Sequence, residues 1–325
     1  MTPYWDCHFF SFFLIFFRRA VSFFSQRPLA SDEIQLVVLS AVALSCGILS
    51  PFLVLKRMTM LANSLSHTIL LGIAIAALVA RCFWGGQWFD VPTLLMGALF
   101  AAFLTALCTE VLTKWFRLQE DASIGLVFTV LFALGITIVT LYLRDVHLGI
   151  EAIMGNADAL QLSDVKLPSL FIAINGLIIF IFFKQFQLVS FDPHLAKTFG
   201  VKVGYFRYVF LFLIAATCIG AFRAVGVILV LTFLTGPYLI ARLFSCRLER
   251  LLVLTPLIGV VASFIGVALS RHLLNIHGWS LSTGGIVSTV IGLMYVGAKS
   301  FVRIRKKVSR SRLIVGSSCE KKSLY

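Results

Sequence analysis

Long apolar runs alternate along the chain with short polar and charged stretches. A helix that crosses a bilayer needs about 20 mainly apolar residues, and nine segments come close to that length. They are residues 34–55, 60–80, 92–113, 124–143, 167–183, 205–222, 224–243, 251–271 and 284–302. The pattern predicts an all-α polytopic membrane protein with eight or nine transmembrane helices. The lower number applies if one pair of segments is re-entrant.

The basic residues favour one orientation of these segments. With a cytoplasmic C-terminal end, the inside loops at 56–57, 114–117, 184–207 and 242–250 hold eleven Lys and Arg, far more than the outside loops, while the outside loop at 144–166 is acidic. This bias follows the positive-inside rule. Nine spans then place the N-terminus outside, a placement that the pair Arg18–Arg19 does not favour, so the topology of that end stays open.

The two ends of the chain differ from the apolar body. We divide the chain into an N-terminal interfacial segment (1–33), a transmembrane domain (34–302) and a basic cytoplasmic tail (303–325). The N-terminal run "HFFSFFLIFF" is too short to span hydrocarbon, so residues 8–24 are predicted to form an interfacial helix. An extra, imperfect span is the alternative.

The composition excludes a soluble domain, and the charge distribution indicates which partners the tail contacts. The chain is 59% hydrophobic and 13% charged, with a mean hydropathy of +0.98, whereas soluble domains are about 25% charged. The tail carries eight Lys or Arg and one Glu, so it contributes half of the net charge of +14. Contact with membrane lipid is favoured over nucleic acid. Seven cysteines without a CxxC motif are interpreted as apolar helix residues.

One segment, "LVLKRMTMLANSLSHTILLGIAIAALV" (53–79), places several polar residues near the start of a predicted span. Asn63 and His67 are four residues apart and therefore share a helix face. Polar groups in a membrane helix need a partner or an aqueous path. Imidazole nitrogen and amide oxygen can bind a metal ion, but they can equally hydrogen-bond to a neighbouring helix. The residues alone leave both interpretations open.

Two cytoplasmic segments have an unusual pattern. Residues 189–207 contain Asp-Pro, a short amphipathic stretch and a Gly, which predicts a brief helix. Residues 236–256 contain an Arg and Glu cluster between two prolines and are predicted to form a second short surface helix. Plain connecting loops are the alternative for both segments. Glu120 and Asp121 are predicted to lie at a helix start, where they oppose the helix dipole.

Four sequence blocks, in order, resemble a known family. They are "FLVLKRMTMLANSLSHTILLGIAIA", "QEDASIGLVFTVLFALGI", "LVSFDPHLAKTFGV" and "RAVGVILVLTFLTGPYLIARL". Together they make the chain similar, over residues 36–302, to the membrane permease of metal-importing ABC transporters of the manganese, zinc and iron class. The family commonly has Asp where this chain has Asn63. An amide brings less negative charge to a cation than a carboxylate does.

The resemblance implies a type II ABC importer permease in the bacterial cytoplasmic (inner) membrane. It implies three kinds of partner: a cytoplasmic ATP-binding subunit, an extracytoplasmic metal-binding protein, and a second permease subunit, either a second copy or a paralogue. The divalent ion (Mn, Zn or Fe) would be the transported substrate, with no permanently bound cofactor. The chain has no G-x-x-x-x-G-K-[ST] phosphate loop, so it is not expected to be an enzyme by itself.

The resemblance also assigns candidate residues. The metal path is expected to use His67, Asn63 and Ser66. Docking of the ATP-binding subunit is expected mainly on the 236–256 segment, with 189–207 as a second contact. The candidate coupling residues are Arg242, Arg247, Glu249, Arg250, Asp192 and Lys197.

Three other functions compete with this one. A related permease for a metal chelate, such as a siderophore or cobalamin, would need a wider path and no His/Asn face. A secondary ion transporter would need carboxylates inside the membrane, yet Asp and Glu lie almost entirely in the predicted loops or at helix ends. A membrane receptor has only the basic tail in its favour.

Overall fold

The structure is a computed structural model that describes residues 30–56, 58–84, 91–142, 157–158, 160–279 and 281–322. The predicted interfacial helix at 8–24 lies outside these residues. The described elements are all helical: α2 (Ser31–Leu55), α3 (Thr59–Trp84), α4 (Val91–Trp115), α5 (Glu120–Tyr142), η2 (Leu162–Val165), α7 (Lys166–Ile181), α8 (Phe183–Phe191), α9 (Pro193–Thr198), α10 (Val203–Val225), α11 (Val227–Phe244), α12 (Leu248–His277) and α13 (Thr283–Lys322).

Nine stretches among the described residues are long and apolar enough to cross a membrane. This confirms the all-α polytopic prediction at the higher of its two numbers. The predicted boundary between 205–222 and 224–243 is also confirmed, because Gly226 separates α10 from α11. Its φ of 88° is accessible to glycine at little cost.

The predicted short surface helix within 236–256 is wrong. α11 continues to Phe244 and α12 begins at Leu248, so only three residues connect two long helices. Both prolines of this segment, Pro237 and Pro256, lie inside those helices. In contrast, the predicted brief helix within 189–207 is present as α9.

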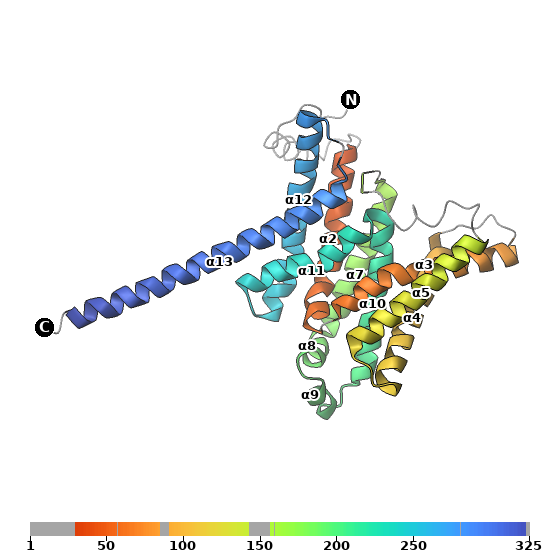
Figure 1. Cartoon of the computed structure of the whole chain (residues 1–325), viewed down its shortest axis with the longest axis horizontal. Helices are drawn as coiled ribbons and strands as arrows, with labels where there is room; N and C mark the ends of the chain where they lie inside the picture. The colour runs from red at the N-terminus through yellow and green to blue at the C-terminus, as the bar shows by residue number, and fades with distance from the viewer. Residues whose placement is uncertain are drawn as a thin grey trace.

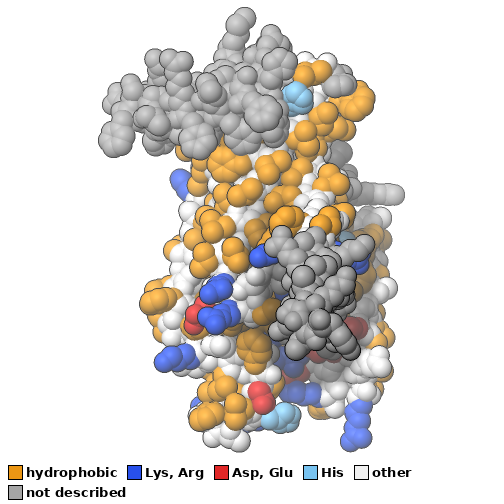
Figure 2. Space-filling view, turned by 90° about the vertical axis from the view of Figure 1, so that its left-hand side faces the viewer, with side chains coloured by type: hydrophobic (Ala, Val, Ile, Leu, Met, Phe, Trp, Pro, Cys, Tyr) orange, Lys and Arg blue, Asp and Glu red, His pale blue; other side chains and the backbone are white. Residues whose placement is uncertain are grey.

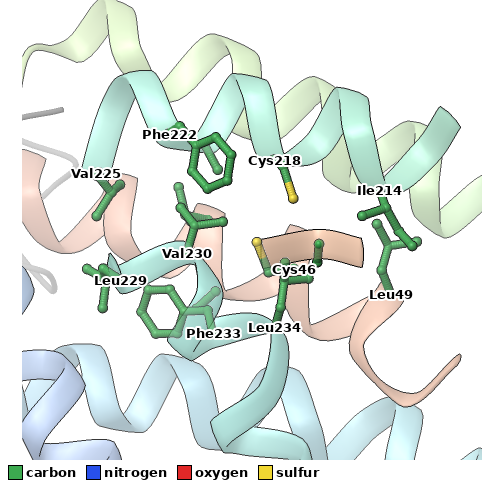
Figure 3. Close-up of a cluster of buried hydrophobic side chains, with 14 of the residues drawn as sticks. Cys46, Leu49, Ile214, Cys218, Phe222, Val225, Leu229, Val230, Phe233 and Leu234 are labelled. Carbon is green, nitrogen blue, oxygen red and sulfur yellow. The ribbon is translucent and has the colours of Figure 1, made fainter. Parts of the chain in front are cut away.

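The centre of the bundle forms around α2. This helix packs against α7, α10, α11 and α12. Figure 3 shows side chains of α2, α10 and α11 meeting in one apolar cluster, with the sulfur atoms of Cys46 and Cys218 directed into the same space. A Cβ atom at Gly47 would come within 2.7 Å of the Pro256 backbone, so the glycine lets α2 and α12 pack closely.

Helices α3, α4 and α5 form one side of the molecule (Figure 1). The backbones of α3 and α4 meet at Gly72 and Gly97, where a Cβ atom on Gly72 would lie 2.1 Å from the Gly97 carbonyl oxygen. Near this crossing the Thr105 hydroxyl donates to the Thr68 hydroxyl at 2.9 Å. Gly72 therefore lets α3 and α4 approach closely.

One end of the bundle is held together by polar contacts. Asp32 at the start of α2 forms an ion pair with Arg271 near the end of α12. The Gln35 amide donates to the Ala157 carbonyl at 2.7 Å, and Asp158 accepts from the hydroxyl of Thr283. These contacts join the ends of the helices that the positive-inside rule places on the outer side.

The opposite end carries α8 and α9, which lie at the lower tip of the molecule in Figure 1. On the face shown in Figure 2, Lys and Arg side chains gather mostly in the lower half, and hydrophobic side chains dominate the upper half. This distribution agrees with the predicted cytoplasmic side. α13 leaves the bundle and continues as a helix through the start of the predicted tail.

Candidate functional site

Asn63 and His67 lie one turn apart on α3, as the spacing predicts. The Asn63 side chain is exposed and the His67 side chain is half-buried. The imidazole packs against two aromatic rings of α5, with centroid distances of 5.1 Å to Phe128 and 5.4 Å to Phe132. One side of the His67 ring is therefore covered by two aromatic side chains of α5. The Asn63 side chain, one turn earlier, is exposed at the surface of the chain.

Ser66 is placed differently from the other two candidates. Its side chain is buried, and its hydroxyl donates to the Asn63 backbone carbonyl at 2.6 Å. Such a bond satisfies a hydroxyl inside an apolar helix. The structure therefore brings Asn63 and His67 to one face, whereas the Ser66 proton is used within the helix.

No cage of ligands surrounds His67 in the described part of the chain. No group of three or more His, Cys, Asp or Glu side chains with metal-binding geometry occurs among these residues. The arrangement thus offers one imidazole and one amide from a single helix. Two such ligands can replace part of an ion's water shell.

The exposed side of α5 is largely apolar but also carries three threonines. Thr129, Thr137 and Thr140 lie on it, and each hydroxyl donates at 2.8 Å to the carbonyl four residues earlier. A hydroxyl bonded in this way remains compatible with lipid and keeps its oxygen as an acceptor. This face can therefore line a path or face the membrane.

The cytoplasmic candidates occupy two separate places. Asp192 caps α9, accepting from the backbone N–H groups of His194 at 2.9 Å and Leu195 at 3.0 Å. Lys197 is exposed on the same helix. Arg247, Glu249 and Arg250 are exposed at the junction of α11 and α12, and Arg242 donates to the Tyr238 hydroxyl at 3.2 Å.

Three large apolar side chains in or next to α9 are exposed. Phe191, Leu195 and Phe199 are 59%, 45% and 70% exposed. Exposed apolar patches that are rimmed by polar groups commonly mark interaction sites. The Asp-Pro start and the Gly stop of this loop predicted the helix but not the exposed apolar side chains, and Gly200 adopts a φ of 75° at the stop.

Lys56 is a functional-site candidate that sequence reasoning missed. It follows α2, and its Nζ lies 4.8 Å from the centre of the Phe210 ring and 5.8 Å from that of Phe186. Among the described residues this buried nitrogen has no hydrogen-bond partner. Burial, with a smaller effect of the nearby Arg207 charge, lowers the pKa of Lys56 to about 8.

Glu120 and Asp121 lie in the first turn of α5, as predicted. Glu120 accepts from Arg207 of α10 at 3.1 Å, so its carboxylate joins two helices in addition to opposing the dipole. A neighbouring cluster joins α4 to α10, since the Tyr208 hydroxyl donates to Glu110 and Glu110 pairs with Lys114.

These features define a class: a multi-pass membrane protein with two polar residues on one face of a spanning helix and an exposed short helix at its basic end. Comparison with known proteins identifies the family. Residues 33–302 match the ABC 3 transport family (ABC-3), and the chain belongs to it. This confirms the predicted kinship with ABC importer permeases and the predicted place in the membrane.

Related proteins cover almost the same length. The chain is 36% identical over 311 residues to a "Probable metal transport system membrane protein" of Chlamydia muridarum, covering 95% of this chain and 97% of the relative. It is 33% identical to the "Manganese transport system membrane protein MntD" of Bacillus subtilis, over 80% of this chain and 88% of the relative.

A solved structure has the same fold. PsaBC from Streptococcus pneumoniae, in complex with Fab, aligns with a TM-score of 0.67 at 24% identity, covering 81% of this chain and 89% of that chain.

Proposed function

We propose that this chain is the permease subunit that carries a divalent metal ion (Mn, Zn or Fe) through an ABC importer of the bacterial inner membrane. The observation that carries the proposal is the Asn63–His67 face of α3, found in a member of the ABC 3 transport family. The manganese and metal transport relatives support the class of ion.

The chemistry of the two side chains suits transfer rather than storage. A neutral imidazole binds Mn, Fe and Zn, and an amide oxygen is a weak, uncharged ligand. An ion in a pathway must bind well enough to enter and weakly enough to leave. Because Asn63 replaces a carboxylate common in the family, this site holds less negative charge, which favours release.

His67 is also held in position by its neighbours. The rings of Phe128 and Phe132 restrict the imidazole on the α5 side. On that side the two rings shield the imidazole from water, so packing against them orients the His67 side chain. Ser66 supports the same turn through its bond to the Asn63 carbonyl, and in this proposal it is a positioning residue.

The remaining machinery comes from partners. ATP would be hydrolysed by a separate cytoplasmic subunit, and a metal-binding protein would deliver the ion from outside. The exposed apolar side chains around α9 make this short helix the main candidate contact for the ATP-binding subunit. The exposed charges Arg247, Glu249 and Arg250 are then a secondary contact. A second permease, either a copy or a paralogue, would complete the pathway and supply further ligands.

Metal accumulation in cells that express the full set of subunits tests this function. We expect ATP-dependent uptake of at least one of Mn, Zn and Fe above that of cells with an inactivated ATP-binding subunit. Supplying each metal as a free salt and as a chelate separates an ion permease from a chelate permease. Uptake of the chelate alone, or ion uptake independent of the ATP-binding subunit, would contradict the proposal.

A further inference from the structure

A second site lies on the opposite side of α3 and α4 from α5. Helices α3, α4, α7 and α10 enclose an apolar groove of about 360 Å³. Leu61, Leu65 and Ala102 are buried in its wall, whereas Phe103 and Phe212 are exposed at its edge. The groove is thus partly enclosed by the fold and open to the surroundings of the helices.

The groove occupies the half of the membrane nearer to α8 and α9. Leu61 and Leu65 lie in the first turns of α3, and Tyr208 and Phe212 lie in the first half of α10. Ile178 lies near the end of α7. By the chain direction of these helices, all three regions are at the basic end of the bundle. The groove therefore opens toward the acyl chains of the cytoplasmic leaflet.

A charged cluster borders the same groove. Tyr208 lines the groove with its ring, and its hydroxyl donates to Glu110. Glu110 pairs with Lys114, but the two side chains differ in exposure, at 14% and 66%. The ammonium group is therefore the part of this pair that faces outward, in the last turn of α4.

We propose that this groove binds one phospholipid of the cytoplasmic leaflet, with an acyl chain against Phe103, Ala106 and Phe212 and the phosphate beside Lys114. An apolar slot at leaflet depth complements the acyl chain, and an outward-facing cation complements the phosphate. Every phospholipid carries this phosphate. The experiment below therefore compares lipids with different headgroups. The inference does not rest on the identity of the transported ion.

Photo-crosslinking of the full-length permease tests the site. The protein is reconstituted into vesicles of phosphatidylethanolamine and phosphatidylglycerol, with a diazirine on an acyl chain of one lipid or the other. We expect labelling concentrated on groove residues. Ala106→Trp, which fills the groove, should reduce this labelling about tenfold, as expected for a lost binding energy near 1.4 kcal/mol. Lys114→Gln should reduce it for the lipids that use the phosphate contact.

Ala173→Trp is the matched control, because Ala173 is exposed on α7 and does not line the groove. It should leave groove labelling unchanged. Equal labelling by both lipids assigns the recognition to the phosphate, and preferential labelling by phosphatidylglycerol assigns it to the anionic headgroup. Groove labelling that survives Ala106→Trp in correctly inserted protein would overturn the proposal. In a parallel sample without the photoreactive lipid, a bifunctional reagent that joined groove residues to a second copy of the chain would also overturn it.

Discussion

At the residue scale, Lys56 has an unusual environment for a cation, since its ammonium nitrogen is buried and has no hydrogen-bond partner among the described residues. The structure packs the Lys56 ammonium against Phe186 and Phe210. Rings of this kind attract cations, yet burial without a hydrogen bond still costs free energy.

Lys56→Met should flatten the dependence of stability on pH. The folded-state pKa of Lys56, about 8, lies below the ordinary lysine pKa of 10.5, so the unfolded chain holds the proton more tightly between these values. Stability should therefore rise as the pH increases through about 8. Thermal unfolding of the detergent-solubilised permease across this range measures the effect. Lys197→Met, on exposed α9, is the control, and an unchanged slope in Lys56→Met would refute this account of Lys56.

The candidate metal residues were predicted only in part. Spacing alone placed Asn63 and His67 on one face of α3, since a helix repeats every 3.6 residues. It could not predict that Ser66 would bond to the backbone of Asn63. Nor could it predict the walls made by Phe128 and Phe132, because which helices pack together is a tertiary property. The spacing of these two rings, four residues apart, was the available signal.

At the element scale, the spans were predicted well and one connection was not. Apolar length is enough to locate a membrane helix, and the nine predicted segments correspond to nine helical stretches. The 236–256 segment was misinterpreted because two prolines and a charge cluster are typical of a loop in a soluble protein. In a membrane bundle neighbouring helices accommodate proline, so α11 and α12 continue through Pro237 and Pro256.

The crossing of α3 and α4 depends on Gly72. A methyl group there would overlap the Gly97 carbonyl, and overpacking of this kind costs about 1–3 kcal/mol or more. Gly72→Ala should therefore lower the thermal unfolding temperature. Gly176→Ala should not, since a Cβ at Gly176 has no described atom within 4 Å apart from its chain neighbours and the backbone of its own helix turns. Equal unfolding temperatures for the two variants would show that α3 and α4 can move apart without a loss of stability, which would contradict this account.

The docking element can be tested by comparing two variants. Leu195→Asp with Phe199→Asp should weaken co-purification of the ATP-binding subunit and reduce transport-coupled ATP hydrolysis, since central apolar contacts cost about 2 kcal/mol or more when lost. Replacing Arg247, Glu249 and Arg250 by Ala should have a smaller effect. The opposite order, with the triple variant uncoupled and the α9 variant normal, would return the main contact to the junction of α11 and α12.

At the scale of the whole molecule, the basic tail is expected to act on orientation and not on transport. Basic residues gain about 1 kcal/mol each near an anionic leaflet. A chain that ends after Lys307 keeps Arg303, Arg305, Lys306 and Lys307, so it should insert normally and retain uptake. Uptake assays normalised to the amount of inserted protein check this. Lost uptake at normal insertion would indicate a regulatory tail.

The whole account depends on whether the α3 face meets the transported ion. His67→Ala removes the imidazole, and its half-buried position beside Phe128 and Phe132 means that only part of its packing is lost. Asn63→Asp restores a carboxylate and should keep transport, with tighter binding or a shift toward harder ions.

Metal uptake by His67→Ala in cells that express all subunits is the most direct measurement. We predict that uptake is abolished or sharply reduced, while the variant inserts, stays folded and co-purifies with the ATP-binding subunit. Normal uptake by this variant would contradict the account. A loss of uptake explained by misfolding would do the same, because it would show that His67 joins helices and does not bind the ion.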